Sequence, residues 1–132
     1  LMAQAGQYNY NRCITRGETA AARLAAYEFA KSALHAIFLL NDSYLPFYKW
    51  QFRALRGLPK LAELAQPLER LLSAAEPENT ERIEQITAAI LDETRAQGLS
   101  SLPHNEAELH AYAVNEQIAD TNLRNQHILY GI

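Results

Sequence analysis

The sequence predicts an all-helical domain, and three observations lead to this prediction. Hydrophobic residues make up 48% of the 132 positions, and valine occurs only once, at Val114. The dominant Ala and Leu lose little side-chain freedom in a helix, whereas β-branched residues favour strands. Apolar residues recur every three or four positions between clear breaks. A chain of this length fits one domain that needs no metal or disulfide to fold.

The helical segments are separated by glycine, proline and asparagine. We expect helices at residues 2–13 and 18–40, the second bounded by Gly17 and Asn41. Two apolar stripes on the second helix predict that it lies in the middle of a bundle. One stripe is formed by Leu24, Tyr27, Leu34 and Phe38, and the other by Ala22, Phe29, Ala33 and Leu40.

Further helices are expected at residues 46–56, 59–75, 80–97 and 106–130. Pro67 should divide the 59–75 segment, and Asn79 with Thr80 should cap the next helix, in which Ile83, Ile86 and Ile90 share one face. Short connections predict an up-and-down antiparallel bundle of four to five helices. Residues 1–132 read as a single domain, and a start in mid-helix leads us to expect the C-terminal part of a longer protein.

Charge and cysteine content indicate which kind of ligand and which cellular compartment to expect. Residues 1–60 hold eight cations and three anions, and residues 61–132 hold four cations and twelve anions. This favours an anionic ligand on the first half, although an ordinary solvated surface explains it equally well. A lone cysteine, no secretory signal pattern and no apolar run near the ~20 residues that span a bilayer predict a soluble cytoplasmic protein without membrane association.

The segment of residues 44–56 is the strongest functional candidate. On a helix, Lys49, Arg53 and Arg56 share one face, and aromatic rings occupy others, among them Tyr48. Guanidinium groups pair with phosphate oxygens, and rings offer a stacking surface for a base. A core helix with inward rings and solvated cations is the alternative interpretation.

Two other groups of residues are weaker candidates. Arg12 and Arg16 would extend the basic group of residues 49–53 into one cleft if the two helices were neighbours. On the last helix, Asp120 and Arg124 are four residues apart and predict a surface ion pair.

The sequence lacks the residue patterns that several kinds of catalysis require. The chain has no His-Glu-x-x-His sequence, no glycine-rich phosphate loop and no Asp-x-Asp pair to hold two metal ions. Cys13 has no base beside it in the sequence, which argues against a thiolate nucleophile. We therefore expect no enzymatic activity and no cofactor in this domain alone.

Three strings exceed a generic helical pattern: residues 6–13 with Arg16, residues 38–50 with Arg53, and residues 118–128. They resemble a bacterial family of unknown function, domain of unknown function 4037, along essentially the whole chain. The resemblance implies a helical substrate-binding domain that follows a nucleotidyltransferase domain of the polymerase-beta type. The N-terminal domain of the same protein would then be the partner, and Mg²⁺ would belong only to that catalytic domain.

The same resemblance supplies candidate binding residues for a nucleotide or small-molecule substrate. They are Gln7, Tyr8, Arg12, Arg16, Tyr48, Lys49, Trp50, Arg53, Asp120, Arg124 and His127. Two other interpretations stay open. The domain could serve only for packing or homodimerisation, without a ligand. A ribonuclease of the helical-bundle toxin class is disfavoured, because Arg124 and His127 have two residues between them and not the four to six of those enzymes.

Overall fold

A computed structural model describes residues 1–129 of the chain, and all regular structure in this part is helical. The π-helix η1 (Met2–Tyr10) continues directly into α1 (Asn11–Thr15). The remaining elements are α2 (Thr19–Leu40), the 3₁₀ turn η2 (Tyr48–Trp50), α3 (Gln51–Leu55), the 3₁₀ turn η3 (Ala62–Leu64), α4 (Ala65–Ser73), α5 (Asn79–Ala96), α6 (Ala107–Glu116) and α7 (Thr121–Arg124). The all-helical prediction is confirmed.

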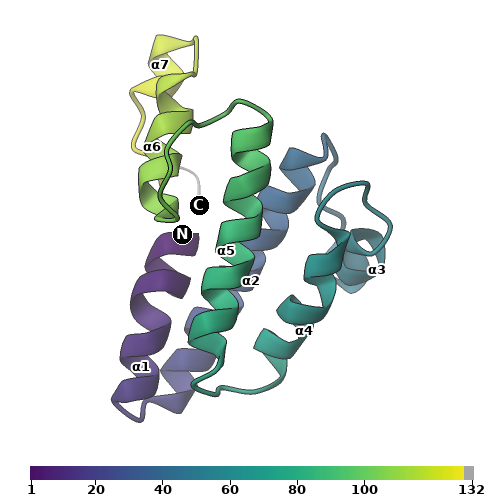
Figure 1. The fold of residues 1–132 in the computed structure, drawn as a ribbon, viewed down its shortest axis with the longest axis vertical. Helices are drawn as coiled ribbons and strands as arrows, with labels where there is room; N and C mark the ends of the chain where they lie inside the picture. Colours follow the sequence, from purple (N-terminus) through teal and green to yellow (C-terminus); the bar gives the residue numbers. More distant parts are fainter. Residues whose placement is uncertain (130–132) are drawn as a thin grey trace.

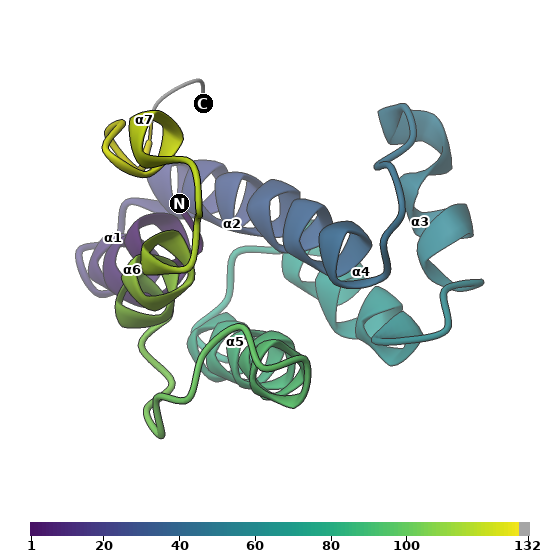
Figure 2. The same cartoon turned by 90° about the horizontal axis from the view of Figure 1, so that it is seen from above.

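The bundle consists of four helical runs that alternate in direction. The η1–α1 run descends in Figure 1, α2 ascends behind it, α4 descends and α5 ascends. Seen from above, α2 and α5 lie on opposite sides of the interior (Figure 2). The short helix α3 lies beside the C-terminal end of α2, α6 lies beside the start of the chain, and α7 lies above α6 in Figure 1. This is the up-and-down arrangement that short connections predict.

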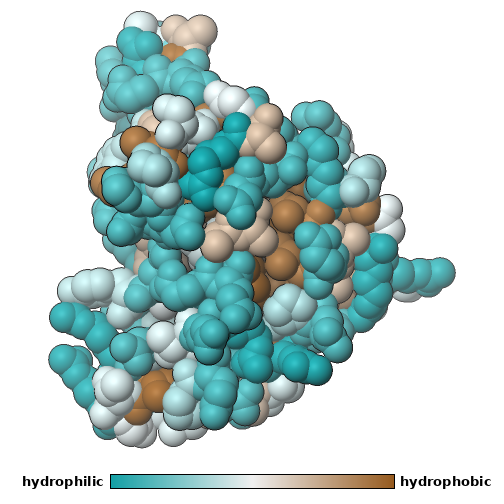
Figure 3. Space-filling view, viewed as in Figure 1, coloured by the Kyte–Doolittle hydropathy of each residue, from teal (hydrophilic) through white to brown (hydrophobic). Residues whose placement is uncertain are grey.

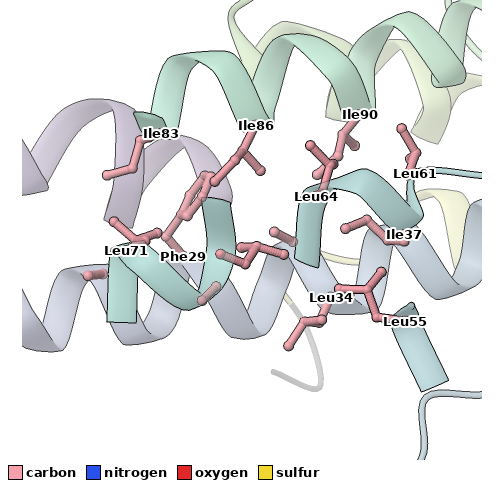
Figure 4. Packing of buried hydrophobic residues seen from close by; sticks show 14 of the residues in the cluster. Phe29, Leu34, Ile37, Leu55, Leu61, Leu64, Leu71, Ile83, Ile86 and Ile90 are labelled. Carbon is pink, nitrogen blue, oxygen red and sulfur yellow. The ribbon is translucent and has the colours of Figure 1, made fainter. Parts of the chain in front are cut away.

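The core is built on one side of α2, where small and large residues alternate. Isoleucines 83, 86 and 90 of α5 point toward side chains of α2 and α4, as expected from their spacing (Figure 4). Leu64, Leu68 and Leu71 complete the interior from the fourth helical segment, and Leu55 of α3 reaches it from the side. Burying a Leu or Ile side chain contributes about 1.5–3 kcal/mol.

The opposite side of α2 is exposed, which corrects part of the predicted stripe pattern. Leu34 and Phe38 are buried as expected, whereas Leu24 and Tyr27 are more than half exposed. The reason is that the other bundle helices cover only one side of α2 within residues 1–129. The face shown in Figure 3 is mostly hydrophilic, with an apolar area between α4 and α5.

A buried hydrogen-bond network replaces the expected helix cap at Asn79. The Asn79 side chain is fully buried and donates to Tyr10 Oη at 3.0 Å and to the Ala74 carbonyl at 2.7 Å. Tyr10 Oη in turn donates to the Glu76 carbonyl at 2.9 Å. Asn79 therefore joins η1 to the connection before α5, because a buried amide requires hydrogen-bond partners. The predicted division at Pro67 is wrong, because α4 (Ala65–Ser73) begins two residues earlier and includes Pro67 in its first turn, where proline is tolerated.

The prediction of a single long helix at residues 106–130 is wrong. Helix α6 ends at Glu116, and Asp120 begins a separate helix, α7. One carboxylate oxygen of Asp120 accepts hydrogen bonds from the backbone of Asn122 at 2.8 Å and of Leu123 at 3.1 Å. An aspartate in this position satisfies free N–H groups at a helix start. Tyr130, the predicted end of that helix, lies outside the described residues.

Gly6 allows a close approach of η1 to Phe29 of α2 and Ile83 of α5, and this generates a prediction. A Cβ atom at Gly6 would overlap the Phe29 ring and lie 2.9 Å from Ile83 Cγ2. We expect Gly6→Ala to lower the free energy of unfolding by about 1–3 kcal/mol, because overpacking forces neighbouring side chains to move. Chemical denaturation measures this change.

The matched control is Gly57→Ala. A Cβ atom at Gly57 would meet only the Ala54 carbonyl oxygen, at 3.5 Å. This variant should stay within about 0.5 kcal/mol of the wild type, as surface substitutions usually do. Equal stability of the Gly6 and Gly57 variants would contradict the close contact.

Candidate functional site

The candidate site lies on a loop whose two ends are joined by Asn41. The Asn41 amide donates to the carbonyl of Ile37 at 2.8 Å and to that of Lys60 at 3.0 Å, and its oxygen accepts from the Lys60 backbone at 3.0 Å. Residues 42–59 therefore start and end at nearly the same place, and Leu55 of α3 within this segment packs into the core. A short side chain that bonds to both ends fixes the base of this loop, at a point that the sequence pattern did not reveal.

An ion pair and two hydrogen bonds strengthen the base. Lys60 Nζ lies 2.8 Å from Glu93 Oε1 on α5, and Gln97 donates to the Leu40 carbonyl at 2.7 Å. Gln97 also donates to Glu93 at 2.7 Å. The hydrogen bonds from Lys60 and Gln97 hold the pKa of the Glu93 carboxyl below its ordinary value. These contacts attach the loop base to the C-terminal ends of both long helices.

Four aromatic side chains between residues 44 and 50 of the loop are largely exposed. The exposed fractions are 100% for Tyr44, 62% for Phe47, 68% for Tyr48 and 54% for Trp50. The rings of Phe47 and Tyr48 have centroids 4.4 Å apart. Exposed rings in such density are unusual, because a free protein surface rarely leaves a contiguous apolar area uncovered.

Two cations complete this surface. Lys49 and Arg53 are exposed and form no ion pair within residues 1–129. The Arg53 guanidinium lies over the Trp50 ring at 5.9 Å from its centroid, within the range of a cation–π contact. We call Tyr44, Phe47, Tyr48, Lys49, Trp50 and Arg53 together the 44–53 surface. All six residues are exposed, whereas Arg56, the third cation of the predicted basic face, forms an ion pair with Glu69.

The single basic cleft that would combine Arg12 and Arg16 with Lys49 and Arg53 is not formed. Helices α1 and α3 lie at opposite ends of α2 in both views (Figures 1 and 2). The 22 residues of α2 span about 33 Å at 1.5 Å per residue. Two groups of cations at that distance cannot bind one small ligand. Arg12 instead lies over the Tyr8 ring and donates to its hydroxyl at 2.6 Å.

Gln7 and Tyr8 lie on the wall of a different hollow, of about 580 Å³. The hollow is lined by the carboxylates of Glu84, Glu106 and Glu108, so its charge is negative and unsuited to a phosphate. The Gln7 amide donates to Glu84 Oε2 and to the Asn105 carbonyl, both at 2.8 Å. Its oxygen accepts from the Ala107 backbone at 3.0 Å. These contacts give Gln7 a structural role in attaching η1 to α5 and α6.

The three predicted site residues near the C-terminus make local contacts. Asp120 caps α7, as described above, and forms no ion pair with Arg124, so the predicted pair is wrong. Arg124 donates to the Ile118 carbonyl at 3.2 Å. His127 Nδ1 accepts from the Leu129 backbone at 3.2 Å. The structure therefore does not bring these residues to the 44–53 surface.

A smaller hollow of about 290 Å³ borders the 44–53 surface at Tyr44. Its remaining lining residues are His35, Phe38, Leu39, Ser43 and Leu45. Helix periodicity gave no reason to connect these residues with the site, because the hollow forms only where the loop turns back at the end of α2. Its volume suits one or two apolar side chains.

Neither a metal site nor a membrane span is found in the described part of the chain. Within residues 1–129 no three His, Cys, Asp or Glu side chains are grouped so that they could hold a metal ion. Over the same residues, no helix combines the length and apolar character that crossing a bilayer requires.

The structure is an all-helical bundle with exposed aromatic and basic side chains on residues 44–53. Residues 1–51 match the family described as Domain of unknown function (DUF4037). The match supports the resemblance to that family over residues 6–13 with Arg16 and over residues 38–50, whereas Arg53 lies outside it. The string at residues 118–128 lies outside the matched range. Comparisons with curated proteins and with solved structures give no match.

The role of Asn41 in holding the loop can be tested by Asn41→Ala. This variant removes three hydrogen bonds, and we expect the free energy of unfolding to fall by about 1–3 kcal/mol. Hydrogen exchange at the Lys60 amide should become faster. Trp50 is the only tryptophan, so its fluorescence anisotropy should drop as the loop gains freedom. Asn9→Ala is the control, since Asn9 is exposed, and a loop signal identical in both variants would contradict this role.

Proposed function

We propose that this domain is an interaction module that binds a second protein domain through the 44–53 surface. The observation that carries the proposal is the exposure of four aromatic rings on a loop fixed at its base. Tyr, Trp and Arg are the residues that most often dominate binding energy in protein interfaces. Because the loop is held by Asn41 and by the ion pair of Lys60 with Glu93, binding would cost little additional ordering of the backbone.

The partner that fits best is a nucleotidyltransferase domain of the polymerase-beta type in the same natural protein. The support is the family resemblance and the position of the matched residues 1–51, which include Tyr48, Lys49 and Trp50. In this proposal the catalytic domain supplies Mg²⁺ and the transfer chemistry. The helical domain helps to enclose the substrate, in the cytoplasm of a bacterium, and is not catalytic by itself.

A photo-crosslinking experiment tests the docking face. The natural full-length protein is expressed with p-benzoylphenylalanine in place of Tyr48, or of Tyr27 as the control. Both tyrosines are more than half exposed, but Tyr27 lies on the outer side of α2. After irradiation, mass spectrometry should identify crosslinks from position 48 to the nucleotidyltransferase domain and few from position 27. Crosslinks of equal yield from both positions, or none from position 48, would show that this face is free.

A second candidate function is the binding of a phosphate-bearing ligand by Lys49, Arg53 and Trp50. It is favoured by the Arg53 guanidinium over the Trp50 ring, which leaves the N–H groups at the guanidinium edge available for phosphate oxygens. Neither hollow described above is lined by these three residues. A ligand would therefore need a second domain to close over it.

Titration with MgATP tests this candidate. We expect no heat of binding from the isolated domain and measurable binding by the full-length protein. Lys49→Gln with Arg53→Gln should raise the Kd at least tenfold, about 1.4 kcal/mol. The control pair is Arg12→Gln with Arg16→Gln, at the other end of α2, and it should leave the Kd unchanged. An equal loss in both pairs would contradict a site confined to the 44–53 surface.

A further inference from the structure

We infer that the partner presents an acidic surface with an apolar centre to the 44–53 surface, an inference that rests on the proposed docking function. The loop and its base carry four cations, and they divide into two kinds. Arg56 forms an ion pair with Glu69 of α4, and Lys60 forms one with Glu93 of α5. Lys49 and Arg53 at the tip have no such partner within residues 1–129. The domain thus neutralises the base of the loop and leaves the tip positive.

The unpaired cations favour carboxylates on the partner. Charges across an interface are arranged so that opposite potentials meet, and like charges in contact disfavour the wrong partner. The Arg53 guanidinium lies over Trp50, so its planar N–H groups can bind a carboxylate with two parallel hydrogen bonds. Carboxylates at the edge of the partner's face would engage Arg53 and Lys49 in this way.

The rings and the adjoining hollow determine the centre of the partner's face. Tyr44, Phe47 and Tyr48 present apolar area beside the cations. The hollow of about 290 Å³ next to Tyr44 is open to solvent and has room for a large aliphatic or aromatic side chain. Interfaces combine such a buried apolar centre with a polar rim. The geometry therefore fits an apolar side chain surrounded by Glu or Asp.

The charge of the 44–53 surface also argues against a second copy of this chain or a nucleic acid as its partner. In a symmetric dimer through this surface the same patch meets itself, so Lys49 and Arg53 of one copy would approach those of the other. Nucleic acid binding rests on many phosphate contacts, whereas this surface offers two cations. An acidic protein surface satisfies the cations and the rings together.

A displayed peptide library tests the partner's chemistry. The library consists of amphipathic helical peptides with Leu fixed on one face and Glu, Lys or Gln randomised on the other. It is selected on the immobilised domain and counter-selected on the Lys49→Gln/Arg53→Gln variant. We expect Glu to be enriched over Lys, and the acidic consensus peptide to bind that variant at least tenfold more weakly. The control variant, Arg23→Gln with Leu24→Ala on the exposed side of α2, should bind as the wild type does.

The outcomes separate this inference from the proposed docking function. Glu and Lys could be enriched equally, with Trp50→Ala abolishing binding of both kinds of peptide. In that case the docking proposal stands, but the inference that the partner is acidic is wrong. If no peptide is enriched, both proposals are wrong. Sedimentation that shows a dimer lost in Trp50→Ala would identify a second copy as the occupant. Binding of single-stranded RNA more tightly than the consensus peptide would assign the surface to nucleic acid.

Discussion

The structure depends on the packing of one side of α2 against the η1–α1 run, α4 and α5. Small residues on that side allow close contact, and Gly6 of η1 leaves room for the Phe29 ring. Close-packed interiors tolerate little change in volume, so the positions of the surrounding helices follow from the side chains of this helix. The connections leave the bundle at the two ends of α2. The loop that carries the 44–53 surface follows its C-terminal end.

Polar side chains have different surroundings in two regions of the molecule. Around the start of the chain, polar side chains such as Gln7, Tyr10 and Asn79 are bonded to other parts of the domain. At the tip of residues 42–59, aromatic and basic side chains are left exposed. Since polar groups that hold the fold are rarely free for a ligand, the difference in hydrogen bonding distinguishes structural residues from candidate binding residues of the same types.

Local patterns predicted the helices better than they predicted the site. The apolar spacing placed residues 18–40 and 80–97 within one residue of the observed Thr19–Leu40 and Asn79–Ala96. The prediction failed at Asp120, where a carboxylate four residues before Arg124 is compatible with both an ion pair and a helix cap. Bonds to the nearby backbone prevail there, as they often do for aspartate. Periodicity also cannot show which apolar stripe a neighbouring helix covers, so the exposure of Leu24 and Tyr27 was missed.

The sequence could group candidate residues that are close together in the chain, but it could not show which distant residues the fold brings together. The rings and cations of residues 44–53 follow each other in the sequence, but only the structure shows that the rings are exposed and not packed inward. The separation of Arg12 and Arg16 from this group follows from the length of α2, and the Asn41 contact joins residues 19 positions apart. No residue spacing within one segment encodes these distances.

The closed base of residues 42–59 has a consequence for how such domains diversify. The two ends of this loop are bonded to each other, and lengthening a loop costs only a modest amount of entropy. Substitutions or insertions near its tip can then alter what is recognised while the bundle keeps its shape. Selection for new specificity and selection for folding would act on largely different residues, as they do in other scaffolds that carry recognition on their loops.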